Sequence, residues 1–401
     1  MRASVVRSGL ESLLSDDGGR LGALSGARVA LVANHTAVDA SYRHAIDRLL
    51  GAGVHLVRLF GPEHGVRATA QDMIGVDEVV DPVTGLPTVS LYGDSAASLR
   101  PAASTLADVD VVLFDIQDIG TRFYTYQATL GFVMQVAGAL GKRVIVLDRP
   151  NPINGVAVEG GRVHPGFESF VGAWPLAVRH GMTVGEIAKW FLAHGGVVCD
   201  LDVIPCEGWD RRDWFERTGL PWVYPSPNMP TVDTATVYPG MCLFEATNWS
   251  EGRGTTRPFH LFGAPWVDPQ RLVVACEREA ADAGLSGVAF RPAAFRPGFQ
   301  KHANVDCGGV EVHVTDRDRL DAYRLGLACV RAARAVDPLR FAWRAEPYEF
   351  VADVPAIDLL TGSGAFRENL EAGGALADLD AAWEAERQSF LAEREGCLIY
   401  G

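Results

Sequence analysis

The stretch RVALVA at residues 28–33 decides the fold class of this chain. Its residues 29–33 are a continuous apolar run, and the stretch lies between Gly26 and Asn34, which is the pattern of a strand buried on both faces. The same pattern predicts three further strands, at residues 54–60, 110–116 (DVVLFDI) and 143–148 (RVIVLD). Helical spacing at residues 40–50 and 123–140 lies between these strands. Strands that alternate with helices predict βαβ units and a parallel sheet in an α/β fold.

The rest of the chain predicts a second, smaller α+β unit. Residues 183–194 predict a helix with a capping box, and the segment from Pro221 to Pro265 predicts an irregular hinge and cleft wall. Further helices are expected near 269–283, 317–335 and 376–395, and strands at 287–291 and 310–315. A length of 401 residues suits two packed domains, which we expect at residues 1–240 and 241–401.

Composition excludes several classes of function. The formal net charge of −14 argues against broad contact with nucleic acid or with an anionic membrane surface. The apolar runs are too short to span a bilayer, and the N-terminal residues MRASVVRSGLESLLSDD lack the apolar region of a signal peptide. The sequence therefore predicts a soluble, cytoplasmic protein.

The cysteines and the standard cofactor motifs point to no cofactor or metal. The seven cysteines form no CxxC pair, so we expect reduced and mostly buried thiols. No GxGxxG follows a strand, and neither a phosphate-binding GxxxxGK[ST] nor a GxSxG nucleophile motif is present. The group His302, Asp306, Cys307 and His313 matches no metal-ligand spacing.

Polar clusters follow three predicted strands, at the sheet edge where ligands of parallel sheets bind. The first, GPEHGVR at residues 61–67, places a carboxyl and an imidazole in a turn. Glu63 is a candidate general acid or base, because a carboxyl enclosed in a pocket can retain its proton near neutral pH. His64 is a candidate for orienting Glu63 or for hydrogen bonding to a substrate. The alternative interpretation is a solvated loop glutamate at Glu63 and a structural loop histidine at His64.

The second cluster, DIQDIGTRFYTY at residues 115–126, suits a sugar site. Sugars are bound by acid–base groups, hydrogen bonds and aromatic faces, and this cluster supplies Asp115, Gln117, Asp118, Arg122, Tyr124 and Tyr126. The alternative is that Asp118 and Thr121 cap the following helix while Arg122 neutralises them. The third cluster, DRPNPING at 148–155, predicts a rigid turn in which Asn151 is the residue most able to reach a ligand.

Two later segments, residues 225–240 and 244–259, are dense in polar side chains and glycine and predict a cleft wall. Arg253 and Arg257 are candidates for clamping a carboxylate. The binding candidates of these segments are Asn228, Glu245, Asn248, Glu251, Arg253, Thr255 and Arg257.

Together, the motifs GPEHG, DIQDIGTRFYTY, DRPNPI-G, PSPNMPTVDTATVYPG and SEGRGTTRPFHLFGAPW resemble the peptidoglycan exo-β-N-acetylmuramidase family of the NamZ type, formerly a domain of unknown function. The resemblance extends from about Gly9 to the C-terminus. It implies a Rossmann-like N-terminal domain, a smaller α/β C-terminal domain and an active site in the cleft between them. It also implies a glycoside hydrolase that removes N-acetylmuramic acid from non-reducing ends of peptidoglycan fragments, with Glu63 as the catalytic glutamate.

The mechanism leaves alternatives open. Our hypothesis is that Glu63 protonates the glycosidic oxygen and that a second group assists. That group is Asp115, Asp118, Glu245, Glu251 or the 2-acetamido oxygen of the substrate. The lactyl carboxylate of muramic acid calls for a cation, for which the candidates are Arg67, Arg122, Arg253 and Arg257. The substrate expected is a peptidoglycan-derived disaccharide or muropeptide. The other functions considered are a non-catalytic binding protein for muropeptides or acidic amino sugars, and a hydrolase or transferase of another acidic sugar conjugate.

Overall fold

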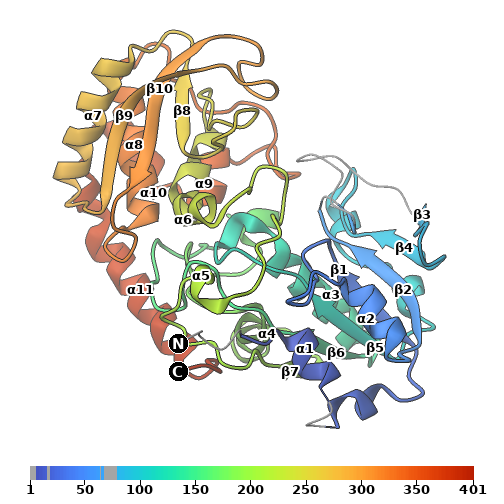
Figure 1. Ribbon diagram of the computed structural model, residues 1–401. Helices are drawn as coiled ribbons and strands as arrows, with labels where there is room; N and C mark the ends of the chain where they lie inside the picture. Colours follow the sequence, from blue (N-terminus) through green and yellow to red (C-terminus); the bar gives the residue numbers. More distant parts are fainter. Residues whose placement is uncertain (1–5, 16–18, 64, 67–78) are drawn as a thin grey trace.

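The larger part of the molecule is built on a mostly parallel sheet. The computed structural model describes residues 6–15, 19–63, 65–66 and 79–401 (Figure 1). Its strands are β1 (Val29–Ala33), β2 (Leu56–Gly61), β3 (Val79–Val80), β4 (Pro87–Ser90), β5 (Val111–Asp115), β6 (Arg143–Leu147) and β7 (Asp200–Ile204). They lie in the order β3-β4-β2-β1-β5-β6-β7. All neighbours pair in parallel except β3, which runs antiparallel to β4.

The strand order has a functional consequence. Without β3, the strands in chain order lie as third, second, first, fourth, fifth and sixth, which is the doubly wound order of the Rossmann fold. From β1, the next strands along the chain are added on one side of the sheet, and from β5 onwards they are added on the other side. Ligands of such sheets bind at this switch point, outside the carboxyl ends of the strands. In the described residues, Asp115 at the end of β5 pairs with Ala33 at the end of β1.

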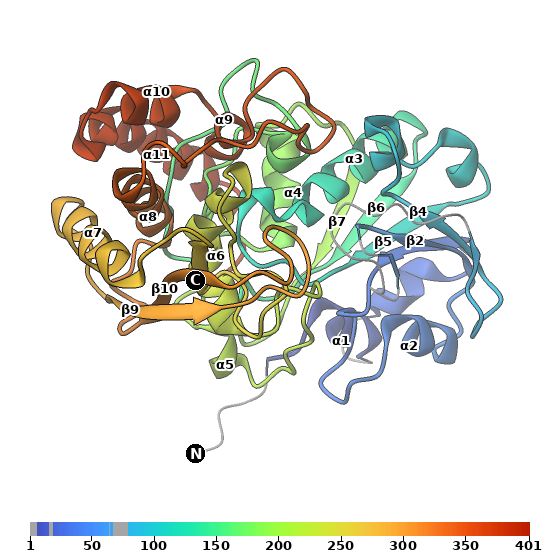
Figure 2. The same ribbon diagram turned by 90° about the horizontal axis from the view of Figure 1, so that it is seen from above.

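Helices cover both faces of this sheet, because successive apolar side chains along each strand point to opposite faces and both faces must be buried. Leu31, Leu113 and Ile145 belong to one core cluster with α1 (Gly9–Leu14) and α2 (Ala45–Gly51). Their chain neighbours, such as Ala30 and Val112, belong to the cluster that includes α3 (Tyr126–Ala139) and α4 (Val184–Ala193). Figure 2 shows α1 and α2 on one side of the sheet and α3 and α4 on the other. This period of two is the pattern of a strand buried on both faces.

A second, three-stranded antiparallel sheet forms the core of the smaller part. Its order is β8 (Leu261–Ala264), β10 (Cys307–Val314) and β9 (Val288–Phe295). The helices α7 (Pro269–Asp282) and α8 (Ala322–Val336) pack against each other, and α8 also packs against α6 (Val232–Met241). The remaining helices are α5 (Phe215–Thr218), α9 (Ala356–Thr361), α10 (Ala365–Ala372) and α11 (Asp380–Glu395). The 3₁₀ turns include η5 (Arg122–Tyr124), η7 (Cys242–Ala246) and η8 (Leu376–Leu379).

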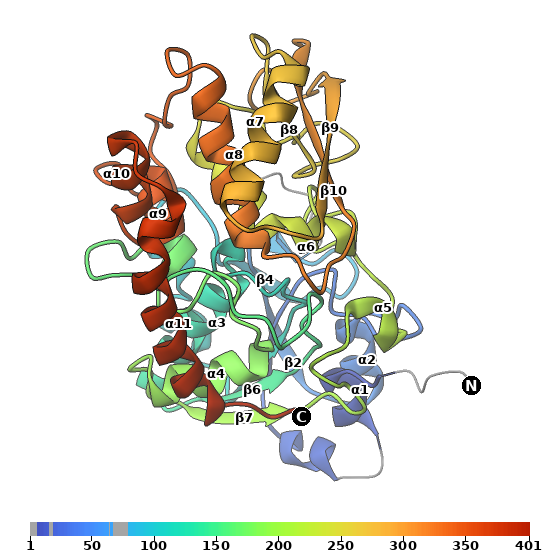
Figure 3. The same ribbon diagram turned by 90° about the vertical axis from the view of Figure 1, so that its left-hand side faces the viewer.

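The C-terminal helix joins the two parts. Figure 3 shows α11 running along one side of the molecule from α10 towards α4 and β7. Near its end, Arg394 donates hydrogen bonds to the carbonyl oxygens of Gly155 and Gly181. Beyond it, the Tyr400 hydroxyl donates to Oδ2 of Asp148 at 2.6 Å. The last residues of the chain therefore pack on the larger sheet.

The predicted α/β fold with a smaller second unit is confirmed, with local differences. The segment from Pro221 to Pro265 is not irregular throughout, because it contains α6, with Pro239 inside the helix, and β8. The helix predicted at 40–50 begins only at Ala45, because the His44 side chain accepts a hydrogen bond from the Ile46 N–H and caps the helix there. The edge strand β7 was not predicted, since its residues are half exposed. Within the described residues, no helix has the length and apolar character needed to cross a bilayer.

Candidate active site

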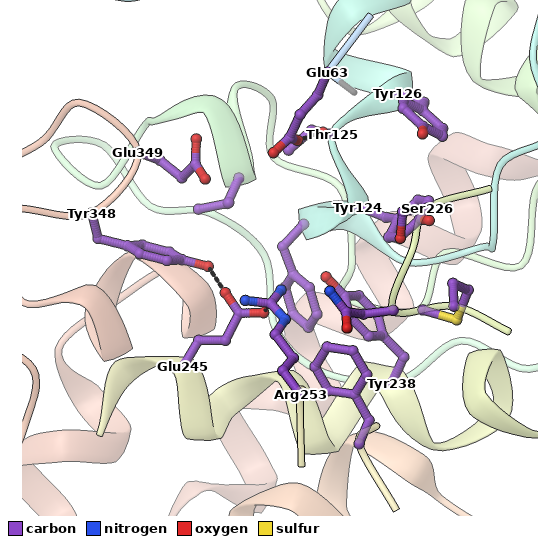
Figure 4. A pocket seen from close by; sticks show the side chains of 15 residues that line it. Glu63, Tyr124, Thr125, Tyr126, Ser226, Tyr238, Glu245, Arg253, Tyr348 and Glu349 are labelled. Atoms are coloured by element: carbon purple, nitrogen blue, oxygen red, sulfur yellow. Dashed lines mark hydrogen bonds and ion pairs between the residues drawn. The ribbon is translucent and has the colours of Figure 1, made fainter. Parts of the chain in front are cut away.

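A pocket of about 510 Å³, including its open mouth, lies where the two parts of the molecule meet. The larger part contributes Glu63 after β2 and residues 123–126 after β5, while the smaller part contributes side chains of α6, η7 and later loops (Figure 4). The full lining is Glu63, Phe123, Tyr124, Thr125, Tyr126, Val171, Ser226, Asn228, Met229, Tyr238, Glu245, Arg253, Phe259, Tyr348 and Glu349. The pocket thus lies at the carboxyl ends of the parallel strands, as the topology requires.

Glu63 reaches the pocket because β2 ends in a tight turn. A Cβ at Gly61 would lie 2.6 Å from the Val66 nitrogen, so the turn requires glycine at this position. Glu63 is 7% exposed, and its Oε2 accepts a hydrogen bond from the Thr125 hydroxyl at 3.2 Å. Burial and the neighbouring Glu63 carboxyl raise the pKa of Tyr126 above its ordinary value. The phenol therefore stays protonated beside the carboxyl.

The wall opposite Glu63 is a network of charged side chains centred on Glu245. Its Oε2 accepts a hydrogen bond from the Tyr348 hydroxyl at 2.8 Å, and its Oε1 accepts one from Nη2 of Arg253 at 2.6 Å. Arg253 also lies 3.9 Å from Glu251, which receives a hydrogen bond from Lys301 at 2.9 Å. Burial opposes the ionisation of Glu251, but Lys301 and Arg253 outweigh it and lower its pKa. Two cations and two carboxylates thus balance each other in this wall.

Glu349 is a third carboxyl of the pocket and is 6% exposed. Its Oε2 lies 3.4 Å from the Tyr92 hydroxyl, which donates to it. The backbone at Glu349 and Phe350 is left-handed, with φ of 47° and 69°. Such angles are uncommon outside glycine and asparagine, so the chain adopts a costly conformation where it delivers this carboxyl.

Aromatic rings complete the pocket. Tyr124 makes edge contacts with Tyr126 and Tyr238, at ring-centre distances of 5.1 and 5.5 Å. Tyr238 in turn contacts Phe259 at 4.8 Å. Burial raises the pKa of Tyr124 and Tyr238 well above the ordinary value, so both phenols remain hydrogen-bond donors at neutral pH. Aromatic faces beside donors and carboxyls suit a sugar ligand.

Six of the residues proposed from sequence lie together in this pocket: Glu63, Tyr124, Tyr126, Asn228, Glu245 and Arg253. His64 and Arg67 lie outside the described residues.

Four candidates of the DIQDIGTRFYTY segment lie elsewhere. Asp115 is fully buried and paired with Arg149 at 2.5 Å. Asp118 accepts a hydrogen bond from the Gly120 N–H at 2.8 Å, and burial raises its pKa to about 6. Gln117 donates to the carbonyl oxygens of Asp118 and Pro150. Arg122 donates to three carbonyl oxygens, including that of Leu360 in α9. These side chains hold the loops that shape the pocket.

The other candidates also make local contacts away from the pocket lining. Asn151 donates to the Met182 carbonyl, and Asn248 bonds with the backbone of Arg340 and Ala342. Glu251 contacts Arg253 and Lys301 behind the pocket wall. Thr255 donates to the Gly252 carbonyl, and Arg257 pairs with Glu311 at 3.3 Å.

Sequence reasoning missed Thr125, Ser226, Tyr348 and Glu349 as lining residues. Thr125 lies in the segment 115–126 and Ser226 in the segment 225–240, so the candidate residues beside them could have pointed to both. Tyr348 and Glu349 stand in the sequence AEPYEF, which carries no local signal and is brought to the pocket by the fold. No cluster of metal-ligating side chains was found among the residues that the structure describes.

Comparisons with known proteins agree along the whole chain. The family model described as "Exo-beta-N-acetylmuramidase NamZ, N-terminal" matches residues 29–233, and its C-terminal counterpart matches residues 236–400. The peptidoglycan beta-N-acetylmuramidase NamZ of Bacillus subtilis is 40% identical over 396 residues, covering 98% of this chain and 91% of the relative. Two crystal structures of DUF1343 family proteins from Bacteroides fragilis are similar, with TM-scores of 0.87 and 0.75 at 32% and 28% identity. Each comparison covers 99% of both chains.

Proposed function

Because this chain belongs to the exo-β-N-acetylmuramidase NamZ family and is a glycoside hydrolase, we propose that Glu63 is its general acid. We further propose that the substrate is a peptidoglycan-derived disaccharide or muropeptide, from whose non-reducing end N-acetylmuramic acid is released. Residues 1–240 would provide the wall that carries the acid, and residues 241–401, together with Tyr238 of α6, the opposite wall. The support comes from one observation, the position of Glu63.

Three features of that position support the proposed role. Glu63 is nearly excluded from solvent, lines the pocket and shares it with two more carboxyls, Glu245 and Glu349. Both burial and neighbouring negative charge favour the protonated form of a carboxyl. In the reaction, the proton of Glu63 passes to the glycosidic oxygen as the bond to the anomeric carbon breaks. The leaving sugar thereby departs as an alcohol and not as an alkoxide.

Recognition of the muramic acid carboxylate is assigned in this proposal to Arg253. Of the four arginines considered, it is the one that lines the pocket among the described residues, because Arg122 and Arg257 make other contacts. A guanidinium has five N–H donors, so Arg253 can bind Glu245 and still donate to a ligand. An analogue without the lactyl group would lack this charge-assisted hydrogen bond to Arg253, which is the basis of the proposed selectivity.

The experiment is turnover of the disaccharide of N-acetylmuramic acid β-linked to N-acetylglucosamine. Glu63→Gln is expected to lower kcat about 10²- to 10⁴-fold, the usual contribution of a general acid. Glu346→Gln, the same substitution at an exposed site, is the control and should retain wild-type activity. Wild-type binding of the disaccharide without release of sugar would contradict hydrolysis and favour a binding protein. Unchanged turnover by folded Glu63→Gln would contradict its role.

A further inference from the structure

The pocket holds a carboxyl that faces Glu63 from the smaller part of the molecule, and we propose that Glu349 is the second catalytic carboxyl. This inference rests on the proposed function of Glu63, since the two groups act in the same step. Glycosidases commonly use two carboxyls that flank the scissile bond. Glu349 is not among the residues that the sequence motifs singled out.

The first argument is position. Glu349 comes from the segment between α8 and α9, and it lines the same pocket as Glu63. Figure 4 shows the two side chains on different sides of the pocket, with Glu245 and Arg253 displaced from the line between them. Only 6% of the Glu349 surface is exposed. A sugar that enters the pocket would therefore meet a carboxyl on each side.

The second argument is the way the backbone holds this residue. Tyr348 and Val351 bond to each other through both backbone groups, at 2.9 and 3.0 Å, and close a tight loop around Glu349 and Phe350. Both enclosed residues are left-handed, a conformation that persists only where the surroundings determine it. The Tyr348 hydroxyl fixes the loop to Glu245, and the Tyr92 hydroxyl contacts Glu349 itself. Contacts from two distant segments thus orient the carboxyl.

The third argument concerns the other carboxyls considered for this role. Glu245 accepts hydrogen bonds from Tyr348, Arg253 and Cys242, and these bonds connect the loop to η7. Asp115 is paired with Arg149 and does not line the pocket. Glu251 lies behind Arg253 and is paired with Lys301. Both Glu245 and Glu349 line the pocket, but Glu349 is the one that faces Glu63 (Figure 4), on the turn that Tyr348 and Val351 close.

The proposed step balances as follows. The bond between the anomeric carbon and the leaving oxygen breaks, and its electron pair stays on that oxygen, which receives the proton of Glu63. A water oxygen bonds to the anomeric carbon and loses one proton to the Glu349 carboxylate. Two free sugars result, with Glu63 ionised and Glu349 protonated. Exchange of one proton with solvent at each group restores the starting state.

The test compares two leaving groups in the full-length enzyme. The substrates are the natural disaccharide and 4-nitrophenyl β-N-acetylmuramide, whose nitrophenolate departs without protonation. Glu349→Gln is expected to lower kcat about 10²- to 10⁴-fold on both substrates, because water must be activated in either case. Glu63→Gln is expected to lose activity on the disaccharide and to retain most of it on the nitrophenyl substrate. Glu346→Gln, in the same loop but exposed, should match the wild type.

Each outcome separates the two claims. A kcat of Glu349→Gln within threefold of wild type on either substrate would overturn the role of Glu349, whatever happens to Glu63→Gln. A higher KM with unchanged kcat would also overturn it and assign Glu349 to binding of sugar hydroxyls. Loss of activity in Glu349→Gln together with full activity of Glu63→Gln on the disaccharide would contradict the proposed function. If Glu349→Gln does not fold, Glu349→Asp keeps the charge but withdraws the carboxyl, and a tenfold or greater fall in kcat on both substrates is expected.

Discussion

At the scale of single residues, ion pairs and hydrogen bonds within the protein fix the charged side chains in and around the pocket. Arg253 is held by Glu245 and lies near Glu251, so its guanidinium is fixed before any ligand arrives. A donor fixed in advance loses little conformational freedom on binding, which favours selectivity. Asp115 and Asp118, by contrast, have roles in holding the loops below the pocket.

The role proposed for Arg253 predicts a loss of selectivity in Arg253→Lys. Lysine retains the positive charge that Glu245 needs but lacks the planar set of donors that binds a second carboxylate. The ratio of kcat/KM for N-acetylmuramide over N-acetylglucosaminide substrates is expected to fall at least tenfold. Arg257→Lys is the matched control, since Arg257 pairs with Glu311. An unchanged ratio in folded Arg253→Lys would contradict the assignment.

Sequence reasoning could find a pocket residue where that residue follows directly after a strand. Glu63 could be proposed because a carboxyl between glycines at a strand end points to the ligand-binding edge of the sheet. Asp115 follows the same rule but is captured by Arg149, a partner that only the fold reveals. Glu349 could not be proposed, because a tertiary contact brings its loop to the pocket.

At the scale of elements, the close packing of α6 on α8 positions one wall of the pocket. The two helices approach at a pair of glycines, and a Cβ at Gly326 would lie 2.1 Å from the Gly240 carbonyl oxygen. Tyr238, which lines the pocket, stands on α6 near this contact. Separation of the helices would therefore move a pocket residue as well as weaken the core.

Gly326→Ala is accordingly expected to lower the free energy of unfolding by about 1–3 kcal/mol, the usual cost of overpacking, and to lower kcat/KM. Urea-induced unfolding monitored by circular dichroism measures the first effect. Gly51→Ala is the control, because no atom from outside its own helix backbone and chain neighbours lies within 4 Å of the Cβ position at Gly51. Equal stability of Gly326→Ala and the wild type would contradict the packing argument.

Element prediction was reliable for apolar strands and poor for α6. The runs that became β1, β5 and β6 are buried on both faces or nearly so, and their sequences are accordingly apolar throughout. Proline content indicated an irregular segment around residues 221–239, but Thr231 caps a helix there and Pro239 lies within it. Packing against α8 overrides the local preference.

At the scale of the whole molecule, the C-terminal residues contact a buried carboxyl of the larger sheet. Asp148, at the end of β6, accepts hydrogen bonds from Thr183, Gly185 and Tyr400. Burial nevertheless raises its pKa to about 6, from an ordinary value of 3.8. Between these two pH values the folded protein binds more protons than the unfolded chain, so stability falls as the pH rises through this window.

Asp148→Asn removes this titration. The variant loses hydrogen bonds at every pH. Because the wild type is destabilised as the pH rises and the variant is not, the free energy of unfolding of the variant minus that of the wild type is expected to increase between pH 4 and pH 6. The increase is at most about 3 kcal/mol. Chemical denaturation at several pH values measures the difference. Asp282→Asn, at an exposed position, should show no such trend. A difference between Asp148→Asn and the wild type that does not vary with pH would contradict the effect of burial.

The central claim is that one buried proton, held by Glu63, leaves with the departing sugar. The most direct measurement is kcat/KM for a series of aryl β-N-acetylmuramides whose leaving phenols differ in acidity. The wild type should depend only weakly on that acidity, because the enzyme supplies the proton, whereas Glu63→Gln should depend on it steeply and approach the wild type for the most acidic phenols. Parallel dependences in the two enzymes would contradict the claim.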